Sequence, residues 1–342
     1  MSPEAAIERE VVLGVRDLRV SFSTRLGPLR AVDGLSFDVT AGEVLGIVGE
    51  SGSGKSVAMY SLLGLVRDAN VTISGSVRFG DREILGLSDK EMQSVRGGQV
   101  GMIFQDPMTA LTPVYTVGWQ IVEQLRAHSD MTKAQARERA VELLADVGIP
   151  DPRSRVDHYP HEFSGGMRQR VVIAMALSCN PRLLIADEPT TALDVTTQAQ
   201  ILELMRRLQA TYGSSIIIIT HDMGVIAEIA DRVVVMYAGR PAEIGPEIDV
   251  VRFPRHPYTW GLLGAVPRLD TKNRRLVTIP GNAVSPLDVP EGCAFAPRCP
   301  HRMDVCDTRP ELHGDPRHLD ACWLSDDQRV AIRSAVLASE AR

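Results

Sequence analysis

The sequence Gly49-Glu50-Ser51-Gly52-Ser53-Gly54-Lys55-Ser56 decides the fold of this chain. It matches the phosphate-binding pattern G-x-x-x-x-G-K-[ST] at every fixed position. The apolar run 44–48 before it predicts a buried strand, and residues 57–65 after it predict a helix. Glycines in such a loop let backbone N–H groups face a polyphosphate, and the helix N-terminus adds a favourable dipole. We therefore predict a nucleoside triphosphate site in which Lys55 reaches the β- and γ-phosphates and Ser56 holds Mg²⁺.

Length and composition indicate a globular protein with one large core and a smaller appended domain. The chain has 342 residues, of which 44% are hydrophobic and 23% charged. Its 37 Lys and Arg against 43 Asp and Glu give a net charge of −6, so no overall basic field is available to hold nucleic acid. Residues 1–10 lack the features of a secretory signal, and the purest apolar run, 216–219, is far shorter than the ~20 residues of a membrane-spanning helix. We expect a cytosolic chain that meets a membrane only through partners.

Two alternating runs upstream of the loop predict antiparallel strands. They span 15–22 and 31–39 and are separated by a polar break. Phe22 ends the first run, where its ring could stack on a nucleobase, although a strand phenylalanine more often belongs to the core. Beyond the loop, 71–79 predicts a short strand pair and 88–96 a polar helix.

Three further apolar runs predict buried strands, and each is followed at once by polar residues. Because the carboxyl ends of parallel strands meet at one edge of a sheet, we expect these polar residues to surround the nucleotide. The runs and the residues after them are 100–104 with Gln105, 182–186 with Asp187 and Glu188, and 215–220 with His221.

These polar residues suit roles in hydrolysis. The carbonyl of Gln105 could reach Mg²⁺ or a water molecule. Asp187 could bind the water shell of Mg²⁺, while Glu188 polarises the water that attacks the γ-phosphate. His221 could contact the γ-phosphate. A surface-loop amide and a structural histidine are the alternatives for Gln105 and His221 at this point.

A helical segment separates two of these strands. Residues 116–160 carry apolar side chains at helical spacing, and Thr132 with Gln135 forms a capping box. Ser164-Gly165-Gly166 then opens another helix. A hydroxyl and two glycines at a helix N-terminus could approach phosphate oxygens, or they could form only an N-cap and a turn.

The order and spacing of these motifs resemble the nucleotide-binding subunits of ATP-binding-cassette (ABC) transporters over residues 12–245. The resemblance implies a P-loop NTPase fold of α/β class, with a mixed-sheet core, an antiparallel β subdomain and a helical subdomain at about 106–175. It implies that Glu188 is the general base, that His221 contacts the γ-phosphate and that Phe22 stacks on adenine. It also places Asp194 at the ATP site. The family sequence Leu-Ser-Gly-Gly-Gln stands here as Phe163-Ser-Gly-Gly-Met167.

In this family two cassettes clamp two ATP molecules between them. The resemblance implies that Ser164, Gly165 and Gly166 contact the ATP held by the phosphate loop of the other subunit. The chain has one copy of each motif and no internal repeat. We therefore expect it to work as a dimer with a second ABC ATPase subunit, identical or not.

The remainder, 246–342, resembles the carboxyl-terminal extension of the oligopeptide/dipeptide importer ATPases, through His256-Pro-Tyr-Thr-Trp, Ile279-Pro-Gly281 and Cys322-Trp323. The resemblance implies ATP-driven peptide import with two transmembrane permease subunits and an extracellular or periplasmic peptide-binding protein. It implies a peripheral position on the cytoplasmic face of the cell membrane. A nickel or other small-solute importer and a soluble, non-transport ABC ATPase are the alternatives. The latter usually carries a coiled-coil insertion or a second cassette, which this chain lacks.

Four of the five cysteines fall within the last 50 residues, with the spacing C-x5-C-x6-C-x15-C. Such clustering in a cytosolic chain favours a metal site over disulfides. Zinc sites usually contain tight C-x2–4-C pairs, whereas four thiolates on a loop-rich tail suit a [4Fe–4S] cluster. Zn²⁺ and unligated thiols stay as alternatives, and His301, His313 or His318 could replace one ligand. The four residues are Cys293, Cys299, Cys306 and Cys322.

Overall fold

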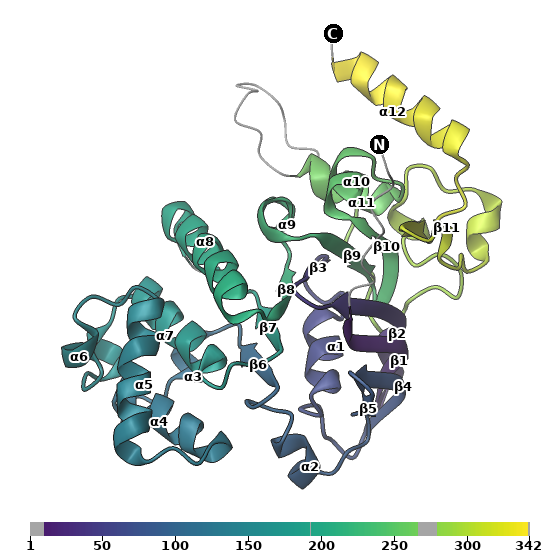
Figure 1. The fold of residues 1–342 in the computed structure, drawn as a ribbon. Helices are drawn as coiled ribbons and strands as arrows, with labels where there is room; N and C mark the ends of the chain where they lie inside the picture. Colours follow the sequence, from purple (N-terminus) through teal and green to yellow (C-terminus); the bar gives the residue numbers. More distant parts are fainter. Residues whose placement is uncertain (1–9, 192, 266–278, 341–342) are drawn as a thin grey trace, which may run out of the picture.

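Two β-sheets, a helical insertion and a carboxyl-terminal extension make up the fold (Figure 1). The computed structural model describes residues 10–191, 193–265 and 279–340. The smaller sheet is antiparallel, with the strand order β2-β1-β4-β5. Its strands are β1 (Val11–Thr24), β2 (Gly27–Thr40), β4 (Val71–Phe79) and β5 (Arg82–Glu83).

The larger sheet contains the strand that leads into the sequence 49–56. Its strand order is β11-β12-β10-β9-β3-β8-β7-β6, and β9, β3, β8, β7 and β6 run parallel. The central strands consist of buried β-branched and aliphatic residues, which is typical of a sheet covered on both faces. Its strands are β3 (Val44–Val48), β6 (Val100–Ile103), β7 (Leu183–Asp187), β8 (Ser215–Thr220), β9 (Arg232–Tyr237), β10 (Arg240–Pro246), β11 (His313–Asp315) and β12 (His318–Asp320).

The helical insertion forms a separate lobe beside β6 (Figure 1). Its helices are α3 (Pro107–Ala110), α4 (Val117–His128), α5 (Lys133–Asp146), α6 (Pro152–Arg155) and the 3-10 turn η1 (Pro160–Glu162). The capping box predicted at Thr132 is confirmed, because its side chain accepts from the N–H of Gln135 and the Gln135 side chain accepts from the N–H of Thr132.

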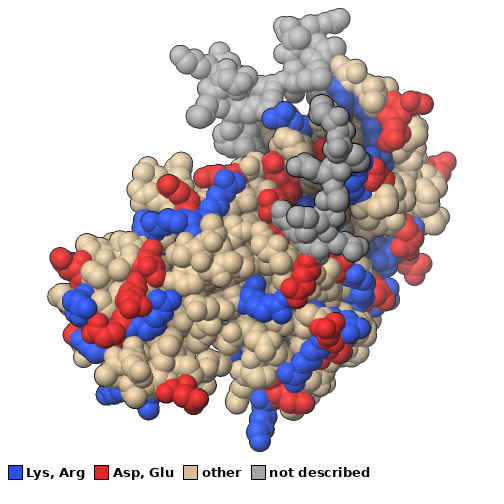
Figure 2. All heavy atoms as spheres, in the orientation of Figure 1, with Lys and Arg blue, Asp and Glu red and all other residues tan. Residues whose placement is uncertain are grey.

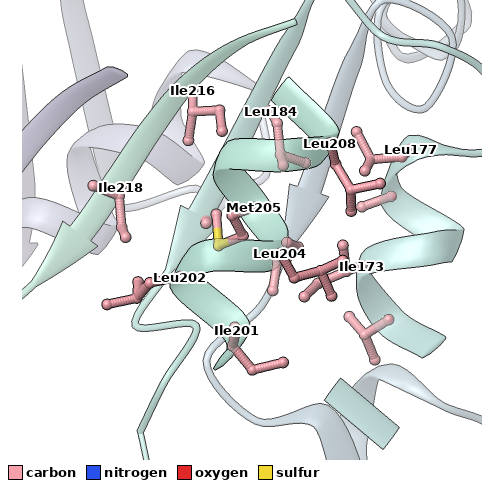
Figure 3. Packing of buried hydrophobic residues seen from close by; sticks show 14 of the residues in the cluster. Ile173, Leu177, Leu184, Ile201, Leu202, Leu204, Met205, Leu208, Ile216 and Ile218 are labelled. Atoms are coloured by element: carbon pink, nitrogen blue, oxygen red, sulfur yellow. The ribbon is translucent and has the colours of Figure 1, made fainter. Parts of the chain in front are cut away.

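Three of the next helices each lead into a strand of the larger sheet, and another leads from β3 to β4 of the smaller sheet. The three are α7 (Gly165–Leu177), α8 (Val195–Tyr212) and α9 (Met223–Ile229), and the other is α1 (Lys55–Leu62), while the short α2 (Asp89–Gln93) lies near the smaller sheet. Figure 3 shows how one face of α8 packs. Its buried residues lie against β7, β8 and α7, and each such aliphatic side chain contributes about 1.5–3 kcal/mol by leaving water. The labelled residues are Ile201, Leu202, Leu204, Met205 and Leu208 on α8, with Leu184, Ile216, Ile218, Ile173 and Leu177 facing them.

The carboxyl-terminal extension continues the larger sheet. Its strand β12 pairs antiparallel with β10, so that Leu319 faces Ile244. The buried carboxylate of Glu243, on β10, accepts hydrogen bonds from the hydroxyl of Thr259 (2.6 Å) and from Nε2 of His318 (2.7 Å). The helical elements of this part are α10 (Glu247–Arg252), α11 (Pro257–Gly264), η2 (Ala296–Arg298), η3 (Asp304–Asp307) and α12 (Asp326–Glu340).

Several boundaries differ from the sequence prediction: the strands predicted at 15–22, 31–39, 100–104 and 182–186 are Val11–Thr24, Gly27–Thr40, Val100–Ile103 and Leu183–Asp187. Residues 71–79 form the single strand β4 rather than a strand pair, because all of it pairs along the long strand β1. The helix after the phosphate loop spans Lys55–Leu62 rather than 57–65, since Lys55 already lies in its first turn. The predicted polar helix 88–96 is shortened to Asp89–Gln93, with Ser88 as its N-cap.

The distribution of surface charge and the character of the helices bear on two of the sequence predictions. Lys and Arg are interspersed with Asp and Glu over the face drawn in Figure 2, so this face presents no continuous basic field. Within the described residues, no helix combines the length and the apolar character needed to cross a membrane.

Candidate active site

The phosphate loop joins β3 to α1 and depends on a glycine at its end. Gly54 caps α1 with φ +94°, a left-handed conformation that glycine adopts readily. A Cβ at this position would lie 2.2 Å from the backbone oxygen of Ala31. Both the conformation and the close approach therefore require glycine at position 54.

The ammonium group of Lys55 lies inside this loop. Its Nζ donates to the carbonyl oxygens of Gly49 (2.7 Å) and Glu50 (2.9 Å), and it is 3.3 Å from the hydroxyl of Ser53. Burial lowers the pKa of Lys55, although the charges of Glu188 and Asp187 oppose that effect. The cation is thus held in the loop by oxygen acceptors that phosphate oxygens could replace.

Asp187 is fully buried at the end of β7 and receives two hydrogen bonds. Ser56 donates its hydroxyl to Oδ1 (3.0 Å), and Tyr60 donates its phenol to Oδ2 (2.7 Å). Burial raises the pKa of Asp187, while these two donors oppose the rise. The structure therefore brings together Ser56 and Asp187, two of the three residues predicted to hold Mg²⁺, while the third, Gln105, contacts Glu188. Tyr60 was not predicted, although its position four residues after Ser56 places both on one face of α1.

Glu188 lies at the meeting point of three strand ends. Its Oε2 accepts from Nε2 of Gln105 (3.1 Å) and from the hydroxyl of Thr191 (2.8 Å), and its Oε1 lies 3.1 Å from Nδ1 of His221. Its φ of +47° is unusual for a residue other than glycine. The backbone N–H donates to Ile219 (2.8 Å), which helps to hold this conformation.

The same contacts tune the acidity of Glu188. Burial alone raises its pKa, but the hydrogen bonds from His221 and Thr191, with the charges of His221 and Lys55, outweigh burial and lower the pKa. Glu188 is therefore an ionised carboxylate near neutral pH, as a general base must be.

The other predicted residues lie outside this cluster. Ser164 caps α7, where its side chain accepts from the N–H of Met167, and α7 packs with the helical insertion (Figure 1). Asp194 caps α8 by accepting from the N–H (2.9 Å) and hydroxyl (2.7 Å) of Thr197. Phe22, on β1, is half-buried against the core below the smaller sheet.

The four cysteines of the extension line one cavity. The buried ring of Phe295, the exposed ring of Trp323 and the side chain of His301 also line this cavity. Burial raises the pKa of Cys299 to about 11 and that of Cys322 to about 12. Within the described ranges, however, no group of three or more His, Cys, Asp or Glu side chains is arranged so that it could hold a metal ion. His318, an alternative ligand, instead contacts Glu243.

This arrangement of loop, carboxylates and histidine defines the class: the chain is an ATPase of the ATP-binding-cassette type. The model of the ABC transporter family matches residues 32–191. That of the oligopeptide/dipeptide transporter carboxyl-terminal region matches residues 242–306. The first match lies within the part predicted as the cassette, and the second begins at residue 242, four residues before the start predicted for the extension.

Relatives agree with these matches over nearly the whole chain. An oligopeptide transport ATP-binding protein from Salmonella typhimurium is 54% identical, over 92% of this chain and 93% of its own length. A dipeptide transport ATP-binding protein from Bacillus subtilis is 52% identical, over 97% and 99% of the two chains. The chain belongs to this family of peptide-transport ATP-binding proteins, which confirms the resemblance predicted from the sequence.

Solved structures resemble the cassette part. A dimeric ATP-binding cassette bound to ADP and phosphate is 26% identical, with a TM-score of 0.61, over 69% of this chain and 98% of that one. A cassette of an ABC transporter complex from Clostridium perfringens is 29% identical, also with a TM-score of 0.61, over 71% and 92%. These similarities confirm the fold of an ATP-binding cassette, and the two structures cover 69% and 71% of this chain.

Proposed function

We propose that this ATPase powers the import of di- or oligopeptides through a membrane permease complex. The main support is the similarity to peptide-transport ATP-binding proteins across both the cassette and the extension. A nickel or other small-solute importer is the second candidate. A soluble, non-transport ABC ATPase is disfavoured because the match to the transporter extension covers residues 242–306.

In the proposed reaction the chain's own groups position ATP and activate water. Lys55 exchanges its loop carbonyl contacts for phosphate oxygens, and Ser56, Asp187 and Gln105 hold Mg²⁺, which neutralises charge on the phosphates. Glu188 accepts the proton of the attacking water, and His221 contacts the γ-phosphate. Phe22 stacks on adenine, and Asp194 borders the site. The backbone N–H groups of residues 49–56 bind the phosphates.

The site is completed by a second ABC ATPase subunit. Ser164, Gly165 and Gly166 open α7, which packs against the helical insertion, whereas the phosphate loop joins β3 to α1. This separation fits a contact with ATP held by the other subunit. A similar cassette was solved as a dimer bound to ADP and phosphate. The proposed complex adds two permease subunits and an extracellular or periplasmic peptide-binding protein, with the dimer peripheral on the cytoplasmic face of the membrane.

The two proposed domains follow one another along the chain. Residues 1–245 form the nucleotide-binding domain, with the helical subdomain at about 106–175, and residues 246–342 form the extension. The pairing of β12 with β10 fits an extension that is fixed to the cassette rather than hinged on it.

We further propose that Cys293, Cys299, Cys306 and Cys322 hold a [4Fe–4S] cluster, with Zn²⁺ as the alternative. They line one cavity, and thiolates are the ligands of such clusters. The cavity is about 10 Å³, room for one water molecule, so the side chains must rotate outward to accept a cluster. Each cysteine would bind a different iron, so the thiols need not converge on one point. Because burial raises the pKa of the Cys299 and Cys322 thiols, binding of these two ligands must release protons, and loading should weaken as the pH falls.

Anaerobic purification with iron and acid-labile sulfide analysis tests the cluster. About four iron and four sulfide per chain, lost in Cys299→Ser, are expected. A preparation that contains only zinc would refute the cluster.

Transport tests the main proposal. Lys55→Ala should abolish uptake of a labelled di- or oligopeptide, because the ATP site loses its buried cation. Lys133→Ala, a change at an exposed position of α5, serves as the control. Unimpaired uptake in Lys55→Ala would count against the proposal, and uptake of Ni²⁺ instead of peptide would favour the second candidate.

A further inference from the structure

We propose that Arg298, in the carboxyl-terminal extension, is a positioning residue for the phosphate loop. Its guanidinium forms a two-pronged ion pair with Glu50, the second residue of the loop. Nη1 donates to Oε2 (2.6 Å) and Nη2 to Oε1 (3.1 Å). Planar pairs of this kind fix orientation as well as distance. The side chain that orients Glu50 thus comes from a part of the chain 248 residues away.

The extension also holds the backbone of Glu50. The hydroxyl of Tyr258, on α11, accepts a hydrogen bond of 2.7 Å from the N–H of Glu50. Tyr258 is fully buried, and its ring packs against Phe295 and Tyr237 at centroid distances of 5.4 and 4.6 Å. Glu50 is therefore held at both its main chain and its carboxylate by residues of the extension.

Arg298 is itself fixed in place. Its side chain is 6% exposed, Nε donates to the carbonyl of Pro280 (2.9 Å), and Nη1 lies 3.3 Å from the hydroxyl of Tyr237. Because its donors are used by neighbours, the guanidinium has few alternative positions. A rigid group of this kind can hold a loop, whereas an exposed arginine would follow it.

Charge gives this contact a direct effect on nucleotide binding. Glu50 adds a carboxylate to a loop whose function is to bind the negative phosphates of ATP. Arg298 neutralises that carboxylate and draws it toward the extension. Without Arg298, the free carboxylate of Glu50 would repel the polyphosphate and lose its orientation.

A second connection joins the extension to the same loop. Nη1 of Arg240 donates to the carbonyl of Gly292 (2.9 Å) in the extension. The neighbouring Gly239 donates its N–H to the carbonyl of Ser53 (3.0 Å) in the loop. The two connections reach positions 50 and 53, so the extension supports the loop at two points.

Nucleotide affinity of the full-length chain tests the proposal. Arg298→Ala should raise the dissociation constant for MgADP by roughly tenfold or more. The dissociation constant of Arg298→Lys should lie between those of the wild type and Arg298→Ala, because lysine keeps the charge but cannot form the planar pair. The matched control is Arg302→Ala. Arg302 lies four residues further on and pairs with Asp307 at the surface, with exposed fractions of 54% and 69%. Its change should leave the affinity within about twofold, as expected for a surface ion pair.

A double variant separates positioning from general damage. Glu50→Gln removes the charge that Arg298 neutralises, so Glu50→Gln/Arg298→Ala should bind MgADP more tightly than Arg298→Ala alone. In steady-state turnover, Arg298→Ala should raise KM for ATP with a smaller change in kcat, since the catalytic Glu188 is not in contact with it.

Three outcomes would overturn the proposal. They are an unchanged dissociation constant in a folded Arg298→Ala, equal losses in the Arg298 and Arg302 variants, and no recovery in the double variant. If Arg298→Ala does not fold, the affinities of Arg298→Lys and Glu50→Gln for MgADP test the proposal instead. An unchanged MgADP affinity in both variants would then refute the role of the ion pair.

Discussion

Glu188 Oε1 lies 3.1 Å from Nδ1 of His221, although the two residues follow different strands, β7 and β8. The same carboxylate also receives hydrogen bonds from Gln105 and Thr191. A general base needs a fixed position and an ionised carboxylate, and these neighbours supply both. Burial alone raises the pKa of Glu188, but the hydrogen bonds from His221 and Thr191 and the charges of His221 and Lys55 outweigh burial and lower the pKa.

Glu188→Gln should abolish steady-state hydrolysis while ATP binding survives. The amide has nearly the same shape but cannot accept the proton of water, so kcat should fall by roughly 10²- to 10⁴-fold. Turnover and MgATP affinity are measured side by side. Glu203→Gln, at an exposed position of α8, is the control and should behave as the wild type. Near wild-type turnover of Glu188→Gln would remove Glu188 from its assigned role.

The pH dependence of hydrolysis should respond to Thr191. The pKa of Glu188 is lowered in the folded chain, so the active carboxylate persists above that pKa and is lost as the pH falls through it. Thr191→Val removes a hydrogen bond of 2.8 Å that lowers the pKa, and the opposing effect of burial remains. The acid limb of the kcat/KM profile should therefore move to higher pH. Thr211→Val, whose hydroxyl bonds only within α8, is the control, and superimposable profiles of Thr191→Val and wild type would contradict this origin of the shift.

The ATP site could be predicted from sequence because its signals are local. The pattern of residues 49–56 is continuous in the chain, and Gln105, Asp187 and His221 each follow directly after an apolar run. Strand periodicity places such residues at one sheet edge without knowledge of tertiary contacts. The structure confirms that these residues gather there, and their chemical roles stay predictions.

The contacts to Glu50 could not be predicted in this way. Arg298 lies 248 residues from Glu50, and Tyr258 lies 208 residues from it. Neither position stands out by periodicity or capping. The pairing of β12 with β10 was missed for the same reason, since each strand contributes only two paired residues to this short ladder. Such contacts depend on how the extension packs, which local patterns do not encode.

Gly165→Ala should separate the function of the dimer from that of the single chain. A Cβ at Gly165 meets no atom within 4 Å, and alanine favours a helix over glycine by up to about 1 kcal/mol. The variant should therefore keep its melting temperature and its affinity for MgADP. If this glycine closes on ATP of the partner subunit, the added methyl group should reduce turnover by roughly tenfold or more.

Turnover, melting temperature and MgADP affinity are measured on the same preparations. Lys133→Ala, at the first residue of α5, changes an exposed position in the first turn of another helix and is the control. Full turnover of Gly165→Ala would contradict a close contact between Gly165 and nucleotide.

Loss of the Asp33 carboxylate should weaken the attachment of the extension. It is buried between three arginines, Arg19 (2.7 Å), Arg240 (3.0 Å) and Arg309 (2.8 Å), the last of which belongs to the extension. Burial alone raises the pKa of Asp33, but the arginines outweigh it and lower the pKa. Its contribution to stability is therefore complete above the ordinary pKa of an aspartate, about 3.9, and is lost as the pH falls through the lowered value.

Asp33→Asn leaves Arg240 and Arg309 near each other without a counter-charge, so the free energy of unfolding at neutral pH should fall by about 3 kcal/mol. Urea denaturation measures it. The matched control is Asp157→Asn, which removes an equally well-formed but exposed pair with Arg137 (2.6 and 2.8 Å) and should cost less than about 1 kcal/mol. Equal losses in the two variants would mean that Asp33 acts only as a surface ion pair. A larger loss for Asp33→Asn that shrinks as the pH falls toward the lowered pKa would identify the charge itself as the cause, because the wild type then loses the same carboxylate.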